Sequence, residues 1–111
     1  MNLIEFSALA QKQIKELSKT YRSIPEDMLH LIDEINADPR KADDLGGNLY
    51  KRRFAIESKG KGKSGSGRAI YVLYQFPVDQ KVVIVEVFDK SDKENISPSR
   101  LKELKKLYKN Y

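Results

Sequence analysis

Residues 68–88 read RAIYVLYQFPVDQKVVIVEVF. The two halves of this stretch, residues 68–76 and 81–88, are rich in the β-branched and aromatic residues that favour strands. Between them lies Pro77-Val78-Asp79-Gln80, whose proline and aspartate are typical of turns. The stretch therefore predicts a β-hairpin at the centre of a sheet.

A third strand is predicted over residues 49–58, where apolar residues recur with a period of two. Tyr50 and Phe54 fall on one face of this strand, and Lys51 and Arg53 fall on the other. Residues 2–6 are predicted to form a short first strand or an extended lead-in. Strands that follow one another through short loops are expected to pair antiparallel.

Three helices flank these strands in the prediction. The first begins at Ser7, where the spacing of apolar residues becomes helical. The second is predicted to begin at Ser23, with Glu26 completing a capping box, and to end before Pro39. The last is predicted to begin at Ser97, because a serine followed by proline is typical of a helix start.

The fold class that follows is α+β, in a single domain over residues 1–111. It combines a small antiparallel β-sheet with an N-terminal helical hairpin and a C-terminal helix. We expect the helices to pack on one face of the sheet, which leaves the other face free to present side chains.

Composition excludes several kinds of function. The chain has no cysteine, so it has neither a disulfide framework nor thiolate chemistry, and His30 is its only histidine. No set of histidines or carboxylates has the spacing of a metal site, so no metal and no cofactor is expected. No apolar run approaches the length of a membrane span, and the first residues lack the features of a signal peptide. These features fit a cytoplasmic protein that does not bind membranes.

The positive charge of the chain is concentrated in one segment. Residues 51–68 contain seven basic residues and one acid, a net charge of +6, whereas the whole chain carries +5. All six glycines lie between Gly46 and Gly67, in nearly the same segment. A focused positive field of this kind points to an anionic partner such as nucleic acid.

Lys51, Arg53 and Arg68 form the candidate catalytic centre, because alternate residues of a strand share one face and Arg68 opens the neighbouring strand. Clustered cations bind phosphate, and arginine can do so with two parallel hydrogen bonds. They also stabilise the extra charge of a pentavalent phosphate transition state, and one lysine among them can serve as a general base. The loop and the last strand end add Lys59, Lys61, Lys63 and Lys90.

Two simpler hypotheses compete with catalysis: the loop binds phosphate without cleaving it, or it is a solvated hairpin tip. Stacking on a base is a further expectation from this region. Because Tyr71 and Tyr74 face opposite sides of their strand, one belongs to the core and the other, which we take to be Tyr71, can stack on a base.

The chain resembles the RelE/ParE superfamily of type II toxin–antitoxin toxins over nearly its full length, and is close to the HigB-like branch. The motifs that carry the resemblance are KTYRS (19–23), LGGNLYKRR (45–53), SKGKGKSG (58–65) with GR (67–68), and DKS (89–91) with ENIS (94–97). The resemblance implies an antiparallel sheet flanked by helices and, in most members, an mRNA endonuclease that acts at the ribosome without metal. It also implies a monomeric toxin and a cognate antitoxin that masks or distorts its basic site.

The positions that match the basic residues of the family are Lys51, Arg53, Arg68, the loop lysines and Lys90. Arg53 and Arg68 are expected to bind the phosphate and the transition-state charge, and Lys51 or Lys61 to transfer protons. Lys90 would complete the rim of the catalytic site. The remaining expected contacts to RNA are Arg52, Lys59, Lys63, Tyr71 and Phe88.

Phe88 departs from the family pattern, because relatives often have tyrosine just before the Asp-Lys pair. A phenylalanine can stack on the substrate but cannot transfer a proton. Functions without cleavage therefore stay open. ParE-like members of the superfamily inhibit DNA gyrase and lack a nuclease site, a degenerate toxin would only bind nucleic acid, and a plain RNA-binding module would bind RNA without slowing growth.

Overall fold

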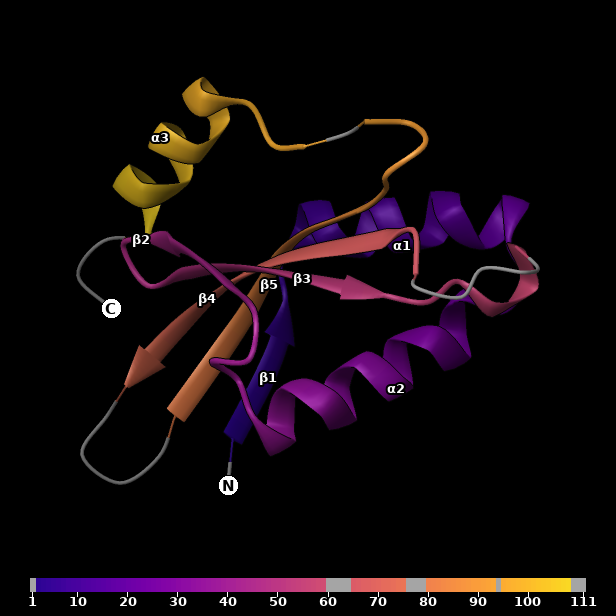
Figure 1. Ribbon diagram of the computed structural model, residues 1–111, viewed down its shortest axis with the longest axis horizontal. Helices are drawn as coiled ribbons and strands as arrows, with labels where there is room; N and C mark the ends of the chain where they lie inside the picture. Colours follow the sequence, from indigo (N-terminus) through magenta and orange to yellow (C-terminus); the bar gives the residue numbers. More distant parts are fainter. Residues whose placement is uncertain (1, 60–64, 76–79, 94, 109–111) are drawn as a thin grey trace.

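The computed structural model of the 111-residue chain describes residues 2–59, 65–75, 80–93 and 95–108. Its centre is a five-stranded sheet with the strand order β1-β5-β4-β3-β2 (Figure 1). Neighbouring strands are antiparallel, except that β1 runs parallel to β5. The strands are β1 (Asn2–Phe6), β2 (Asp43–Gly46), β3 (Leu49–Phe54), β4 (Gly67–Gln75) and β5 (Gln80–Asp89).

The predicted central hairpin is confirmed by the pairing of β4 with β5, which runs from Gly67 opposite Asp89 to Gln75 opposite Gln80. The register shifts once, between Ile70 and Tyr71, and this bulge increases the local twist. Residues 76–79, where the turn is predicted, lie outside the described residues.

Strand β3 is shorter than predicted. It ends at Phe54 and is followed by a 3-10 turn, η1 (Glu57–Lys59), rather than by extended chain to residue 58. The short strand β2 was not predicted, because its sequence, DDLG, has no alternation of apolar and polar residues. Gly46 at the end of β2, and Gly47 and Asn48 in the turn to β3, all have positive φ angles, a backbone that glycine and asparagine adopt most readily.

The helices are α1 (Ala8–Thr20), α2 (Ile24–Ala37) and α3 (Pro98–Leu107). The predicted starts of α1 and α3 are confirmed, because the hydroxyls of Ser7 and Ser97 each accept a backbone N–H of the first turn. The capping box predicted for α2 is wrong. The Ser23 hydroxyl makes no capping bond and instead donates to the carboxylate of Asp27 at 2.6 Å.

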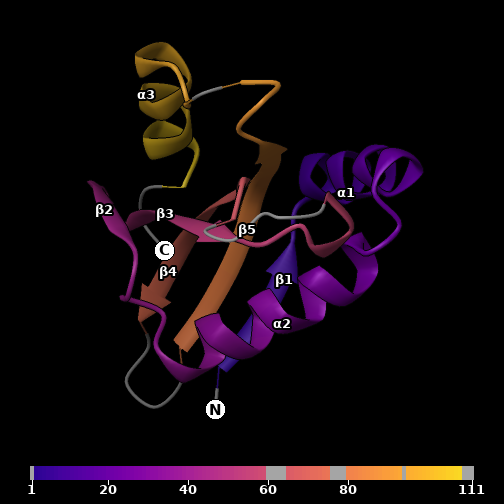
Figure 2. The ribbon, with the colours of Figure 1, turned by 45° about the vertical axis from the view of Figure 1, so that its right-hand side comes forward.

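The helices lie on both faces of the sheet, so the expectation that all of them share one face is wrong (Figure 2). Apolar residues of α1 and α2 pack with Tyr71, Leu73 and Ile84 on one face. Leu101 and Leu104 of α3 pack with Ile70 and Val72 on the other face. The apolar stripe of α3 needs a surface to cover, and the first face is already occupied.

None of the helices in the described part of the chain has the length and apolar character that a membrane crossing requires.

Candidate nucleic-acid interface

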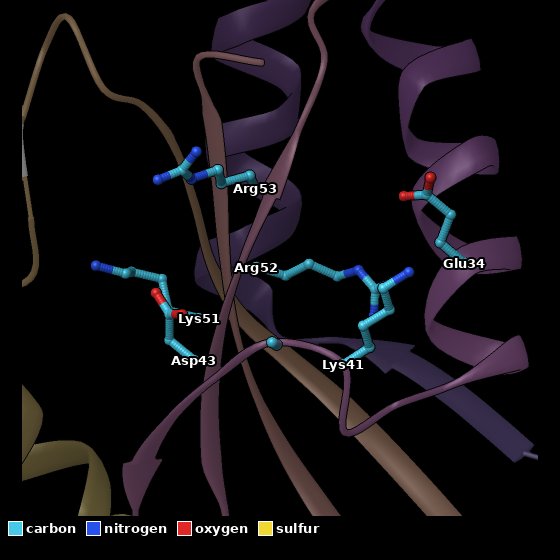
Figure 3. A pocket seen from close by; sticks show the side chains of 7 residues that line it. Glu34, Lys41, Asp43, Lys51, Arg52 and Arg53 are labelled. Atoms are coloured by element: carbon cyan, nitrogen blue, oxygen red, sulfur yellow. The ribbon is translucent and has the colours of Figure 1, made fainter. Parts of the chain in front are cut away.

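Lys51, Arg53 and Arg68, which we call the basic face, lie on one side of the sheet as predicted, but α3 packs on that side, which was expected to be free of helices. Arg53 pairs in register with Arg68 across β3 and β4, and Lys51 pairs with Ile70 two residues further along. Figure 3 shows the side chains of Lys51 and Arg53 on the same side of β3. The three cations therefore come from nearby positions of two neighbouring strands.

Arg68 is the most enclosed of the three, with a relative exposure of 7%. Its Nη1 atom donates to the carbonyl oxygens of Gly65, at 3.1 Å, and Gly67, at 2.9 Å. Burial lowers the pKa of Arg68, and the nearby charge of Arg53 lowers it further, whereas Asp43 and Asp89 act in the opposite direction. A guanidinium remains charged under these conditions, so Arg68 is a fixed cation beside Arg53.

Lys51 and Arg53 border a hollow of about 490 Å³ (Figure 3). Strand β2 pairs with Leu49–Lys51, and within the described residues no strand lies on the outer side of β3 beyond Lys51. Lys51 is half-buried, and its Nζ donates to the Oδ1 of Asn95 at 3.1 Å. The hollow is lined by Glu34, Lys41, Ala42, Asp43, Lys51, Arg52 and Arg53.

Phe88 belongs to the same face, because it pairs in register with Arg68 across β4 and β5. The ring is buried, and the Nζ of Lys93 lies 4.7 Å from its centroid. The Lys93 ammonium group lies over one flat side of the ring, where a stacked base would lie. The expected stacking position is therefore covered by a cation in this structure.

Glu86 is an acid that sequence reasoning missed on this face. It is buried opposite Ile70, and its carboxylate accepts from Lys93 at 3.0 Å and from Arg100 of α3 at 2.7 Å. Burial would raise the pKa of Glu86, but the hydrogen bonds from Arg100 and Lys93 give a net lowering. The available signal was a charged residue inside the otherwise apolar run KVVIVEVF.

Other predicted residues lie elsewhere. The half-buried side chain of Arg52 points away from Lys51 and Arg53, toward Glu34 of α2, and its Nη1 donates to the carbonyl of Asp38 at 3.0 Å. Arg52 is therefore not part of the basic face.

Tyr71 is fully buried, with 0% exposure, and its hydroxyl donates to the carbonyl of Pro39 at 2.7 Å. Its ring stacks on Tyr50 on the side of the sheet that α1 and α2 cover. Because α1 and α2 cover this side of the sheet, a base cannot reach the ring, and we do not keep Tyr71 in the site. Tyr74, on the opposite face of the strand, is also buried.

The loop lysines divide into two groups. Lys61 and Lys63 lie outside the described residues. The ammonium group of Lys59 contacts the carboxylate of Asp89, and its side chain is only 29% exposed. Lys90 is exposed, and its backbone N–H donates to the carbonyl of Ser66.

His30 is exposed on α2, and within the described residues no three histidine or carboxylate side chains come together in a way that could hold a metal ion.

The fold and the basic face define a class of molecule: a small α+β domain whose central sheet presents arginine and lysine beside an aromatic strand end. A family model described as the RelE toxin of the RelE/RelB toxin–antitoxin system matches residues 6–111. The chain therefore belongs to the RelE toxin family, whose members are toxins of type II systems with a RelB-type antitoxin as cognate partner. No individual protein with a curated function matches the chain.

Proposed function

We propose that this RelE-family toxin is an mRNA endonuclease of the HigB-like branch that acts on the translating ribosome without a metal ion. Toxins of the RelE family are typically ribosome-dependent mRNA endonucleases. The observation that supports the proposal most strongly is the register of Arg53 with Arg68, which brings two arginines to one face of the sheet together with Lys51. Paired guanidinium groups match the oxygens of a phosphate.

The chemistry needs few groups from the protein. The 2′-oxygen of the RNA attacks the adjacent phosphorus, the bond to the 5′-oxygen breaks, and a 2′,3′-cyclic phosphate and a 5′-hydroxyl form. Arg53 and Arg68 bind the non-bridging oxygens and stabilise the charge of the pentavalent transition state. A proton leaves the 2′-hydroxyl and another joins the 5′-oxygen, and Lys51 and Lys61 are the candidates for these transfers.

Phe88 fits this proposal as a platform for a base rather than as a proton donor, since its ring has no ionisable group. It lies opposite Arg68, so a nucleotide stacked on Phe88 would carry its phosphate toward the basic face. Lys93 would have to leave the ring first. Lys90, at the end of the same strand, would hold a neighbouring phosphate.

The antitoxin would act on this same surface. We infer that the RelB-type partner neutralises a monomeric toxin by masking or distorting the basic face. Acidic side chains of the partner would be attracted to it, because the sheet concentrates cations there.

The test is 5′-end mapping of cellular mRNA shortly after induction of the wild type and of the Arg53→Ala, Arg68→Ala double variant. We expect new cuts in register with codons for the wild type only. Lys19→Ala is the matched control, because Lys19 is an exposed cation on α1 that pairs with Glu16, and this variant should cut like the wild type. Intact mRNA in arrested cells would overturn the proposal, and a DNA damage response would then indicate gyrase as the target.

A further inference from the structure

Asp89, the last residue of β5, is a buried carboxylate on the side of the sheet away from the basic face. Its side chain is 0% exposed, and both of its oxygens lie 3.0 Å from the Nζ of Lys59. The backbone N–H of Ser91 also donates to it, at 3.1 Å. A buried carboxylate with this many donors is a strong and fixed acceptor.

Lys59 connects Asp89 to the start of β4. Besides Asp89, its Nζ reaches the hydroxyls of Ser66 and Ser91, each at 3.3 Å, and lies 5.7 Å from the centroid of the Tyr21 ring. The backbone gives a second link, because the N–H of Lys90 donates to the carbonyl of Ser66 at 2.8 Å. Ser66 is therefore held to the end of β5 by its side chain and by its backbone.

The residues on either side of Ser66 hold Arg68. The carbonyl oxygens of Gly65 and Gly67 are the acceptors of the Arg68 guanidinium. Both glycines are packed so closely against Phe54 that a Cβ atom at either position would overlap it. The position of the Arg68 guanidinium thus depends on where this segment, Gly65–Ser66–Gly67, is held.

We propose that Lys59 and Asp89 are positioning residues that fix Gly65–Ser66–Gly67, and through its carbonyls the guanidinium of Arg68, and that Lys59 does not hold RNA phosphate. The charge of Lys59 faces a buried carboxylate, which removes most of its attraction for an external anion. The effect on RNA cleavage rests on the proposed nuclease function, whereas the effect on Arg68 does not.

The two roles of Lys59 predict opposite effects of Asp89→Asn. If Lys59 held phosphate, removal of its acidic partner would free the ammonium group and strengthen RNA binding. If Lys59 positions Arg68, Asp89→Asn and Lys59→Met both slow cleavage by about 10- to 100-fold at saturating ribosome complex, because misplaced catalytic groups are costly. The concentration of ribosome complex that gives half the maximal rate should change little in either variant.

Single-turnover cleavage of mRNA on purified ribosome complexes measures both quantities. The Lys59→Met, Asp89→Asn double variant should be no slower than the slower single variant, since both changes break one link. Lys59→Arg should recover part of the rate, because a guanidinium can still bridge Asp89 and Ser66. The inference would be overturned if the losses in rate of the two single variants added up in the double variant. It would also be overturned if Lys59→Met raised only the half-saturating concentration and left the cleavage rate at saturation unchanged.

A second measurement does not depend on nuclease activity. In a ¹⁵N–¹H spectrum the Arg68 Nε–H signal, assigned by its loss in Arg68→Lys, should be sharp in the wild type and broadened in Lys59→Met and Ser66→Ala. Lys19→Met, which breaks an exposed ion pair, is the control and should leave the signal unchanged.

An unchanged Arg68 signal in both variants would overturn the positioning role. A broadened signal in a protein that never cuts mRNA would refute the proposed function and leave the positioning role intact. Ser66→Ala keeps the test decisive should Asp89→Asn fail to fold, since Ser66 is not in the buried core.

Discussion

Asp89 shows how a single residue ties stability to pH. Burial alone would raise its pKa, but hydrogen bonds from the Ser91 amide, the Lys59 ammonium and the Tyr21 hydroxyl lower the pKa to about 2. The hydrogen bond to Asp89 in turn raises the pKa of Tyr21. An aspartate in an unfolded chain titrates near a pKa of about 3.9. The folded state therefore favours the ionised carboxylate.

This lowered pKa predicts that Asp89→Asn destabilises the protein in a pH-dependent way. Above about pH 4 the wild type should be more stable than the variant by about 1–2 kcal/mol. This figure is smaller than the full pKa shift implies, because Lys59 is partly exposed and solvent screens its charge. The advantage should shrink as the pH falls toward 2, because Asp89 then becomes protonated in the folded state as well.

Urea unfolding of both proteins at pH 7 and at pH 3 measures the two differences. A gap that stays constant between these pH values would show that the charge of Asp89 does not provide the stability.

Sequence reasoning found the basic face because it needs only local periodicity. A strand has a period of two, so Lys51 and Arg53 had to share a face once residues 49–58 were taken as a strand. The partner of Lys59 could not be found in this way, because Asp89 lies 30 positions away along the chain. The burial of Tyr71 likewise depends on α1 and α2 covering its side of the sheet.

At the scale of elements, strands β3 and β4 approach closely where Gly67 faces Phe54. A Cβ atom at position 67 would overlap the Phe54 ring, which is itself buried. Glycine is thus required here by the close approach of the two strands and not by an unusual φ angle.

We predict that Gly67→Ala costs about 1–3 kcal/mol of unfolding free energy, the usual range for an overpacked core. Phe54→Leu in the same chain should relieve part of this cost by making room, so the double variant should be less destabilised than the sum of the single changes. Thermal or urea unfolding of the four proteins completes the cycle. Strict additivity would contradict the proposed overlap.

Helix α3 is held to the sheet by a small apolar contact and by the ion pair of Arg100 with Glu86. Its leucines differ sharply in burial: Leu104 is 1% exposed and Leu107 is 61% exposed. They offer a matched pair of substitutions within one helix.

Leu104→Ala should lower the unfolding free energy by about 2–4 kcal/mol, whereas Leu107→Ala should change it by less than about 0.5 kcal/mol. Chemical unfolding measures both values. Hydrogen exchange of the α3 amides should also become faster in Leu104→Ala. Equal effects of the two changes would mean that α3 is not docked as described.

The elements themselves were predictable to different degrees. The start of α1 was predicted from the change to helical spacing at Ser7, and the start of α3 from a serine cap followed by proline; both are local signals. The side of the sheet on which α3 packs is not local, because it depends on which face the other helices leave uncovered. The parallel pairing of β1 with β5 is not a local signal either, because it joins distant parts of the chain.

Across the whole molecule, the net positive charge comes from one region. Residues 51–68 carry more net positive charge than the entire chain, so the remainder is slightly acidic. Attraction to a polyanion should therefore depend on a few cations in that region rather than on the total charge.

We predict that Arg53→Ala lowers the slope of log affinity against log salt for single-stranded RNA by about 0.7, the value for one lost phosphate contact. Lys19→Ala should leave the slope unchanged, since Lys19 lies outside the basic region. Fluorescence anisotropy with an RNA oligonucleotide over a range of salt concentrations gives the slopes. Equal slopes for wild type and Arg53→Ala would remove Arg53 from the interface.

The parallel pairing of β1 with β5 has a practical consequence for labelling this toxin. Asn2 pairs with Gln80 at one end of β5, whereas Phe88 and Asp89 lie at the other end, roughly 30 Å away at strand spacing. A fluorophore or affinity tag joined ahead of Asn2 would thus be remote from the basic face. Helix α3, by contrast, packs on the same side as that face. The amino end is therefore the better place to attach a probe for following the toxin on ribosomes.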